Sequence, residues 1–265
     1  MIRDLKELNG YRVQAVDGDI GKVNDLYFDD QFWTIRYMVV DTGGWLSERK
    51  VLISPTAMDK PNWEKKTLSV SVTKEQVESS PSIDTDKPIS RRHEQALHEH
   101  YKWPFYWNMD PYAAQAGSIA YAHYMARQEE KIKEEAKEQE KDEGDSNLRS
   151  TREVIGYRIH AEDGEIGYVD DFIVDDENWI MRYMVVNTRN WLPGKKVLVS
   201  PAWTEKISWA EREVYVDLLR EVIKDSPEFD PSAPVNRDHE DMLYDYYGRP
   251  KYWTRSLEKR QKSME

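Results

Sequence analysis

The chain contains the same long segment twice, and this duplication constrains its fold more than any other feature. Gly10 to Trp107 align without a gap with Gly156 to Trp253, and about two fifths of the aligned positions are identical. A repeat of this length corresponds to a whole domain, because the units of solenoid proteins are only about 20 to 50 residues long. With 265 residues, 39% of them apolar, the chain can bury two cores of ordinary size. We therefore expect two small domains.

Each copy begins with two strands joined by a tight turn. Asp17-Gly18 and Asp163-Gly164 follow the first β-rich run of each copy, and such a pair favours a type I′ hairpin because both central residues need positive φ. Gly21 and Gly167 come early in the second strand, where a missing side chain indicates a bulge or a tight barrel corner.

Three further strands are expected in the first copy, at residues 33–41, 50–54 and 67–72, and at the equivalent positions of the second. They are rich in β-branched and aromatic residues, and Pro55 ends the run at 50–54. Short strands separated by turns at such spacing indicate a small antiparallel barrel. The expected fold class is mainly β: two tandem small antiparallel β-barrels, each followed by a short helical tail and joined by a charged helical linker.

The succession DGDIGKVNDLYFDD, RYMVVDTGGWL and KVLISP resembles the PRC-barrel family, the small β-barrel shared by the H subunit of the photosynthetic reaction centre and the ribosome maturation factor RimM. The resemblance covers about residues 5–80 and 151–226. It implies a barrel of five or six strands that acts chiefly as a docking surface. The chain lacks the transmembrane anchor of the first relative and the preceding unrelated domain of the second, so it looks more like the soluble bacterial proteins that carry two such barrels.

A second shared block follows each barrel and predicts a short helical tail. Ser90 and Asn236 are good N-cap residues, and the first helix should run from about Arg91 to Lys102, before Pro104. The i, i+4, i+8 spacing places three residues of each copy on one helical stripe, which should pack against the barrel. These residues are His93, Leu97 and Tyr101 in the first copy and His239, Leu243 and Tyr247 in the second.

The domain boundaries follow from the repeat and from composition. We place the first domain with its tail at residues 1–107 and the second at 151–253. Residues 108–150 contain a run rich in Glu, Lys and Ala, which predicts a helical spacer with few apolar residues to bury. Residues 254–265 form a charged C-terminal tail.

The histidines of the first tail raise the question of a metal site. His93, Glu94, His98, Glu99 and His100 are close in sequence, but Tyr244 and Tyr246 replace His98 and His100 in the second copy. A duplicated metal site should keep its ligands, so we expect none, with His93 and His239 in a structural or capping role. The acidic pairs Asp29-Asp30 and Asp175-Asp176 lack the ligand spacing of a calcium loop and are expected to cap turns.

No catalytic motif stands out. The sequence contains no Cys, no phosphate-binding Gly-rich loop, no GxSxG elbow, no dinucleotide fingerprint and no HExxH helix. Arg36 and Arg182 occupy the same place in an apolar strand and are expected to pair with a carboxylate of their own domain, Asp25 and Asp171 being the candidates, with an interface anchor as the alternative. We expect no enzyme activity and no cofactor.

The aromatic residues are the best candidates for contact with a partner. Six of them are expected in loops or outside the strands: Trp45, Trp191, Tyr106, Trp107, Tyr252 and Trp253. Large aromatics in such places can anchor a partner or can staple the tail helix onto its barrel, and stapling is the favoured interpretation for the two Tyr-Trp pairs. The two copies of the loop differ, with Gly43-Gly44 before Trp45 and Arg189-Asn190 before Trp191, so any binding should differ too.

A bivalent docking or scaffold protein of the bacterial cytoplasm, regulatory or stress-related, is the function expected. Its partner would be another protein, and the two barrels could form a pseudo-dimer or the chain a homo-oligomer. The net charge of −12 argues against nucleic acid, and no apolar run approaches the roughly 20 residues needed to insert into a membrane. The alternatives are a soluble accessory of photosynthetic or other membrane-linked electron-transfer complexes, and a metal-dependent enzyme that uses the His and Glu residues of the tail helix.

Overall fold

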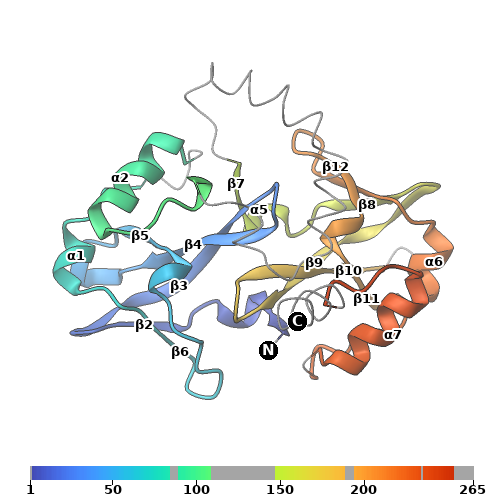
Figure 1. Cartoon of the computed structure of the whole chain (residues 1–265), viewed down its shortest axis with the longest axis horizontal. Coiled ribbons are helices and arrows are strands. Elements are labelled where there is room, and N and C mark those ends of the chain that lie inside the picture. Colours follow the sequence, from blue (N-terminus) through green and yellow to red (C-terminus); the bar gives the residue numbers. More distant parts are fainter. Residues whose placement is uncertain (1, 84–88, 109–146, 189–193, 234, 254–265) are drawn as a thin grey trace, which may run out of the picture.

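Strands dominate the structure, and 13 of them belong to one hydrogen-bonded sheet (Figure 1). The computed structural model describes residues 2–83, 89–108, 147–188, 194–233 and 235–253. The described helices are short: α1 and α2 lie at one outer end of the molecule, α6 and α7 lie at the other, and α5 lies near the middle. The protein is thus mainly β, as its sequence predicts.

The first copy of the repeat contains the five strands that the sequence predicts, to within three residues at each end. They are β2 (Arg12–Ala15), β3 (Gly18–Asp29), β4 (Thr34–Asp41), β5 (Lys50–Ile53) and β6 (Thr67–Ser69). The α-helices and 3-10 turns around them are η1 (Leu5–Leu8), η2 (Gly43–Leu46), η3 (Pro55–Ala57), α1 (Lys74–Glu78), α2 (Arg91–Tyr101) and η4 (Tyr106–Asn108).

The second copy repeats the five strands at equivalent positions and adds one strand. Its strands are β8 (Arg158–Ala161), β9 (Gly164–Asp175), β10 (Ile180–Asn187), β11 (Lys196–Val199), β12 (Thr204–Ser208) and β13 (Glu213–Val216). Its helical elements are α5 (Thr151–Val154), η5 (Pro201–Trp203), α6 (Arg220–Asp225) and α7 (Arg237–Tyr247).

Strand pairing is the same in the two halves. In each, a long antiparallel ladder, β3 with β4 or β9 with β10, is flanked by a short parallel pair, β2 with β6 or β8 with β13. The chain leaving β5 returns alongside β6, since Asp59 N donates to Ser69 O and Ser71 N donates to Ala57 O, both within 3.0 Å. In the second half the equivalent return segment is long enough to form β12, which pairs with β13.

Two further strands were not foreseen, and each pairs with the opposite half. β1 (Ile2–Asp4) is antiparallel to β9, and β7 (Leu148–Ser150) is antiparallel to β3. The described N-terminal residues therefore lie between the two halves (Figure 1). At the centre, β4 and β10 meet through the pair Thr34↔Ile180, so the halves share one sheet.

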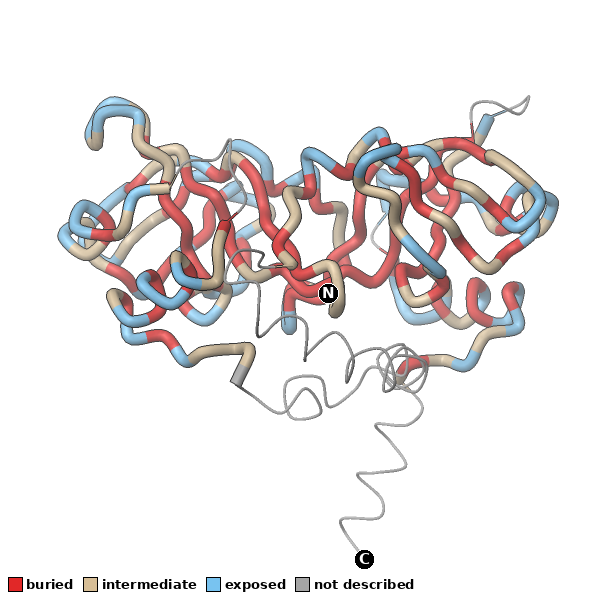
Figure 2. Tube along the Cα trace, turned by 90° about the horizontal axis from the view of Figure 1, so that it is seen from above, coloured by how far each residue is buried: buried red, intermediate tan, exposed pale blue. Residues whose placement is uncertain are grey.

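Apolar packing continues across this junction. Phe28 stacks on Trp33 at 5.2 Å between ring centroids, and both rings contact Phe172 of the other half at about 6 Å. Trp33 and Trp179 both adopt positive φ, and their carbonyl groups accept hydrogen bonds across the junction from Met181 N and Ile35 N. Figure 2 shows buried chain running through the middle of the molecule as well as through each half.

The predicted type I′ turns are wrong. The loop between β2 and β3 is Val16-Asp17, and of the pair Asp17-Gly18 only the glycine has positive φ, at 140°. Asp17 instead accepts a hydrogen bond from Lys74 N at the start of α1, and Asp163 binds Arg220 N in the same way. The carboxylate is thus used to cap a helix, a role that selects Asp at the turn without requiring positive φ.

The bulge at Gly21 is confirmed. The β2–β3 register shifts between Val13 and Gln14, opposite this glycine. A Cβ atom on Gly21 would lie 2.1 Å from Asp41 O, and one on Gly167 would lie 2.1 Å from Asn187 O. The strand can approach its neighbour this closely only without a side chain.

Several predictions fall outside the described residues. These are the helical spacer within 109–146, the loop residue Trp191 and the tail from 254. In the part of the chain that the structure describes, no helix combines the length and the apolar character needed to cross a bilayer.

Candidate functional site

The tail helix of each half is held by its cap and by the predicted stripe. Ser90 Oγ accepts from His93 N at 3.3 Å and Asn236 Oδ1 accepts from His239 N at 2.9 Å, so each helix starts where the sequence places it. The stripe residues Leu97 and Leu243 are fully buried in the core. Tyr101 stacks on Trp103 at 4.2 Å, and Tyr247 packs on Trp203 at 4.6 Å. Burial lowers the pKa of both stripe histidines, His93 and His239.

Beside this stripe, each tail helix buries a glutamate, and these two are the least exposed carboxylates among the described residues. Glu94 on α2 is 0% exposed. Its Oε2 accepts hydrogen bonds from the hydroxyl groups of Tyr37 on β4, at 3.0 Å, and Tyr106 on η4, at 2.5 Å. Its Oε1 forms an ion pair with Arg91 at 2.9 Å. One carboxylate therefore ties the helix to the sheet and to the segment that follows the helix.

The second half repeats this arrangement with the same residue types. Glu240 Oε1 accepts from Tyr183 at 2.7 Å and from Tyr252 at 2.8 Å, and Arg237 lies 2.8 Å from Oε2. Glu240 is 1% exposed. We call these two sets, Arg91–Glu94–Tyr37–Tyr106 and Arg237–Glu240–Tyr183–Tyr252, the first and the second buried network.

A bulge that occurs in both halves directs an arginine to each network. In the β3–β4 ladder Tyr27 pairs with Tyr37 and Phe28 with Ile35, so Arg36 is the extra residue. Arg36 lies 4.1 Å from the ring centroid of Tyr106 and pairs with Asp29 at 3.3 Å. A bulge re-aims the side chain that it adds, which explains how a charged residue within an apolar strand reaches the edge of the network.

The carboxylate partners predicted for the two strand arginines are therefore wrong. Arg182, equivalent to Arg36, pairs with Asp175 at 3.0 Å and packs 4.2 Å from the ring centroid of Tyr252. Asp25 and Asp171 instead accept hydrogen bonds from the start of the opposite half. Asp25 binds the hydroxyl of Thr151 at 3.0 Å, and Asp171 binds Lys6 N at 3.2 Å.

Burial dominates the electrostatics of both networks. It raises the pKa of Glu94 and of Glu240, although the adjacent arginine and the two tyrosine hydroxyls act in the opposite direction. It also raises the pKa of Tyr37 and of Tyr183 well above the usual value of a phenol. The tyrosines therefore stay protonated and act as hydrogen-bond donors that link the helix to the sheet.

The networks differ at one position, where His98 of α2 is replaced by Tyr244 of α7. His98 is 1% exposed, and its Nε2 lies 2.8 Å from the Tyr37 hydroxyl while its Nδ1 lies 2.8 Å from Pro104 O. Aromatic rings surround it, with Trp107 at 5.0 Å and Phe105 at 5.7 Å between centroids. Burial lowers the pKa of His98.

The histidines and glutamates considered as metal ligands face different partners. His100 Nε2 lies 2.8 Å from Gln76 O, and Glu99 binds Gln95 at 2.8 Å, whereas Glu94 belongs to the first network and His98 contacts Tyr37 of that network. Within the described ranges, no group of three or more His, Asp and Glu side chains is placed to hold a metal ion.

The candidate partner-binding aromatics lie in two settings. Trp45 is 37% exposed, donates from Nε1 to Ile20 O at 2.9 Å, and has Lys74 Nζ 4.7 Å from its ring centroid. The Tyr-Trp pairs instead pack on their helices, where Arg91 lies 4.5 Å from the Trp107 ring centroid and Arg237 lies 4.3 Å from that of Trp253. Trp45 thus keeps a solvent-exposed face, while Tyr106 and Tyr252 are held in the networks.

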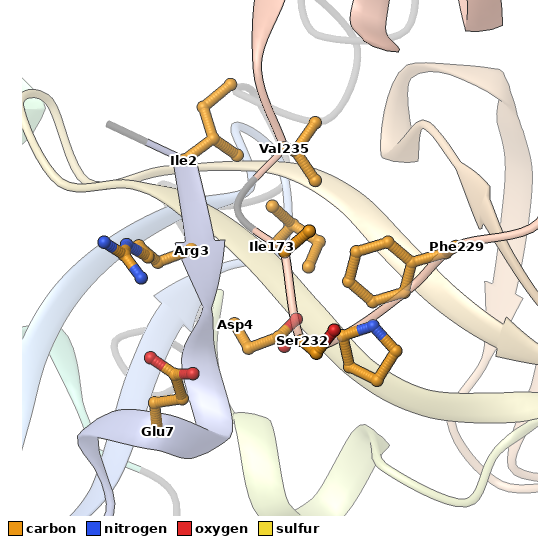
Figure 3. Close-up of a pocket in the computed structure, with 10 residues that line it drawn as sticks. Ile2, Arg3, Asp4, Glu7, Ile173, Phe229, Ser232 and Val235 are labelled. Carbon is orange, nitrogen blue, oxygen red and sulfur yellow. The ribbon is translucent and has the colours of Figure 1, made fainter.

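Two pockets are lined by described residues. A pocket of about 30 Å³, which has room for a water or two, lies at the junction between β1 and the segment around Phe229 (Figure 3). Its lining includes Asp4, whose buried Oδ1 has no hydrogen-bond partner among the described atoms. A wide, open groove of about 450 Å³ lies beside the β2–β3 turn, with Asp19 and Asp59 as the titratable residues among those that line it.

The central role of the two glutamates was not predicted from the sequence. Two signals were available: each follows an arginine by three residues on a helix, and the sequence repeats the pair in both copies. What the sequence did not contain is the pairing of each glutamate with a strand tyrosine, because Tyr37 and Glu94 come together only through the tertiary fold.

Comparisons with known proteins identify one part of the chain. Residues 2–77 match the family model of the PRC-barrel domain, a range that spans β1 to β6 and most of α1. A search of curated proteins found no match to the chain.

Proposed function

Because the chain carries a PRC-barrel domain, we propose that it is a non-catalytic docking or scaffold protein of the bacterial cytoplasm, built from two PRC-barrel modules that act as one pseudo-dimer. The observation that carries this proposal is the exchange of strands between two halves of the same construction, β1 onto β9 and β7 onto β3.

The second module is supported by its correspondence with the matched one. Every strand from β2 to β6 has an equivalent in the second half with the same pairing partners and direction, including the unusual parallel pair. In each half the hydrogen-bonded path leads from the parallel pair through the long ladder and back along the chain that follows β5 or β11. A sheet that returns to its own first strands in this way has the connectivity of a small barrel.

The pseudo-dimer is supported by contacts at the junction that occur in equivalent pairs. Asp171 accepts from the backbone of Lys6, and Asp25 accepts from the equivalent Arg152 N. Such reciprocal contacts are typical of an isologous interface, in which each side offers the same surface to the other. Two docking faces would then be held at a fixed separation and orientation, and a rigid arrangement lowers the entropic cost of binding a partner at both.

A docking role also agrees with the chemistry of the buried networks. Their tyrosine hydroxyls, glutamates and arginines bind one another, and burial keeps the phenols protonated. Groups arranged in this way stabilise the fold. Trp45 offers a partner an exposed aromatic surface, because part of its ring faces solvent while its indole N–H already donates to Ile20 O.

The experiment is affinity capture of the tagged chain from its host with quantitative mass spectrometry. We would compare the wild type with the double variant Trp45→Ala/Trp191→Ala, and with Met242→Ala as a control, because Met242 is 48% exposed on α7 and lies outside both loops. We expect a partner that is lost from the double variant and retained by the control, with all three proteins folded by circular dichroism.

Equal recovery of every protein by the wild type and the double variant would contradict a docking role for these loops. The cellular compartment is tested in the same host by fractionation. A chain that sediments with membrane complexes would favour the electron-transfer accessory over a cytoplasmic scaffold.

A further inference from the structure

The first buried network contains three contacts in a row that each require a hydrogen. The Tyr37 hydroxyl lies 3.0 Å from Glu94 Oε2 and 2.8 Å from His98 Nε2, and His98 Nδ1 lies 2.8 Å from Pro104 O. All three distances are those of ordinary hydrogen bonds. At the two ends of this chain stand a carboxylate and a backbone carbonyl, which only accept.

Counting hydrogens shows a deficit. With Glu94 ionised and His98 neutral, these three side chains offer only two hydrogens for the three contacts, one on the Tyr37 hydroxyl and one on the imidazole. The imidazole hydrogen must be on Nδ1, because Pro104 O cannot donate, and Nε2 then competes with Glu94 for the single hydrogen of Tyr37. The other tautomer moves the conflict to Pro104 O. Every assignment leaves one pair of acceptors in contact.

One additional proton satisfies all three contacts. If Glu94 carries it, Glu94 donates to Tyr37, Tyr37 donates to His98 Nε2, and His98 Nδ1 donates to Pro104 O. If His98 carries it, the imidazolium donates at both ends and Tyr37 donates to Glu94. In either case the remaining hydrogen bond, from Tyr106 to Glu94 Oε2, is kept.

Burial favours the proton on Glu94. It raises the pKa of Glu94 and lowers that of His98, whereas the positive charge of Arg91 lowers the pKa of both groups. Two groups on other elements face Glu94, namely Tyr106 on η4 and Asp29 on β3. Asp29 is itself paired with Arg36 on β4. Asp29 raises the pKa of Glu94 as well.

The second network provides an internal control, because it has no such deficit. Glu240 Oε1 receives one hydrogen from Tyr183 and one from Tyr252. Tyr244 stands in place of His98, and its hydroxyl brings its own hydrogen while also being able to accept one. The second network is therefore satisfied with Glu240 ionised.

We propose that the hydrogen-bonded side chains Glu94, Tyr37 and His98 together hold one proton that the second network does not need. Loss of this proton as the pH rises loosens α2 and residues 104–108 from the sheet. The two halves would then respond differently to pH, the first opening while the second stays closed. The inference stands on the hydrogen-bond geometry of the first half and is independent of the docking role proposed above.

The direction of the effect follows from linkage. A group that binds its proton more tightly in the folded protein stabilises the fold at low pH, and the stabilisation is lost as the pH rises through the folded-state pKa. Between the pKa of the opened state and the higher pKa of the closed state, the equilibrium constant for opening should increase up to tenfold for each pH unit, and above the closed-state pKa it should level off.

The test has two measurements on the full chain between pH 5 and 9. Infrared difference spectra of wild type against Glu94→Gln, with NMR of the His98 ring nitrogens, report where the proton lies. Hydrogen exchange of α2 amides relative to α7 amides in the same molecule reports opening, because the ratio cancels the intrinsic effect of pH on exchange. We expect a protonated Glu94 carboxyl that disappears on raising the pH, together with a rising α2-to-α7 exchange ratio.

His98→Tyr, which copies the second half, should abolish the pH dependence of the ratio. His98→Asn is the alternative if the larger ring does not fit, because its amide can still donate to Pro104 O and frees Tyr37 to donate to Glu94. An imidazolium at His98 with a rising ratio would also support the proposal. Ionised Glu94 beside neutral His98 throughout the range, or a ratio that does not change with pH, would overturn it.

Discussion

Replacing Gly21 by alanine tests whether the close approach of β3 to the end of β4 holds each half together. The new Cβ would lie 2.1 Å from Asp41 O and 2.9 Å from Thr42 Cα, and both are backbone atoms that cannot rotate away. Gly21 also has φ of 140°, which side-chain-bearing residues rarely adopt.

Two costs add in this variant. Holding a non-glycine residue in a sparsely populated backbone region costs about 1–3 kcal/mol. Forcing additional volume into a packed site costs a further 1–3 kcal/mol or so. The reduced entropy of the unfolded chain returns roughly 0.4–1 kcal/mol. We therefore expect the free energy of unfolding to fall by about 1–5.5 kcal/mol in Gly21→Ala.

Urea denaturation followed by far-ultraviolet circular dichroism measures this loss. With a denaturant slope of about 2 kcal/mol per M, the midpoint should move down by about 0.5–3 M. Gly44→Ala is the matched control, because nothing lies within 4 Å of its Cβ position and its φ is not in the left-handed region. The reasoning would be refuted by a Gly21→Ala midpoint equal to that of Gly44→Ala.

Three further predictions concern the junction and the networks. A protease site placed within residues 109–146 should leave the two fragments associated after cleavage, because β1 and β7 each pair with the opposite half; separation on size exclusion would contradict this. Burial raises the pKa of Asp4 to about 6 and that of Asp171 to about 7, so the free energy of unfolding should fall as the pH rises from about 4 to 7. Asp4→Ser introduces the residue found at the equivalent position, Ser150, and should reduce the pH dependence of the free energy of unfolding. Thermal melting at a series of pH values measures this dependence, and an unchanged dependence would contradict a role for Asp4 and Asp171. Tyr252→Phe should lower the free energy of unfolding by about 1–3 kcal/mol in urea denaturation, since a buried carboxylate loses one donor; a loss no larger than that of an exposed control such as Tyr246→Phe would place the stabilisation elsewhere.

Local chemistry made much of each half predictable. Pro55 ends β5 at the expected place, and Ser90 and Asn236 cap the tail helices through their side chains. The glycine at position 21 marks a bulge, as its place within an apolar strand indicates. These features depend on a few neighbouring residues, so they can be predicted from a single sequence.

The features that failed depend on register and on contacts between distant segments. The partner of Arg36 is Asp29 and not Asp25, because a bulge in the middle of the ladder moves the arginine relative to its neighbours. The strands β1 and β7 have three residues each, too few to show a period, and their partners lie more than a hundred residues away. Three-residue strands acquire their structure from the ladder that they join.

The exchanged strands also bear on how the chain is made. β3 is complete once residue 29 has left the ribosome, but the strand that covers its edge, β7, is synthesised more than a hundred residues later. An uncovered edge is a template for pairing with other chains. During synthesis the first half must therefore wait with an open edge until β7 emerges, and β1 must wait longer still for β9. A nascent chain that stalls between the two copies would expose this edge, which makes the interval between them the stage at which aggregation or help from a chaperone is most expected.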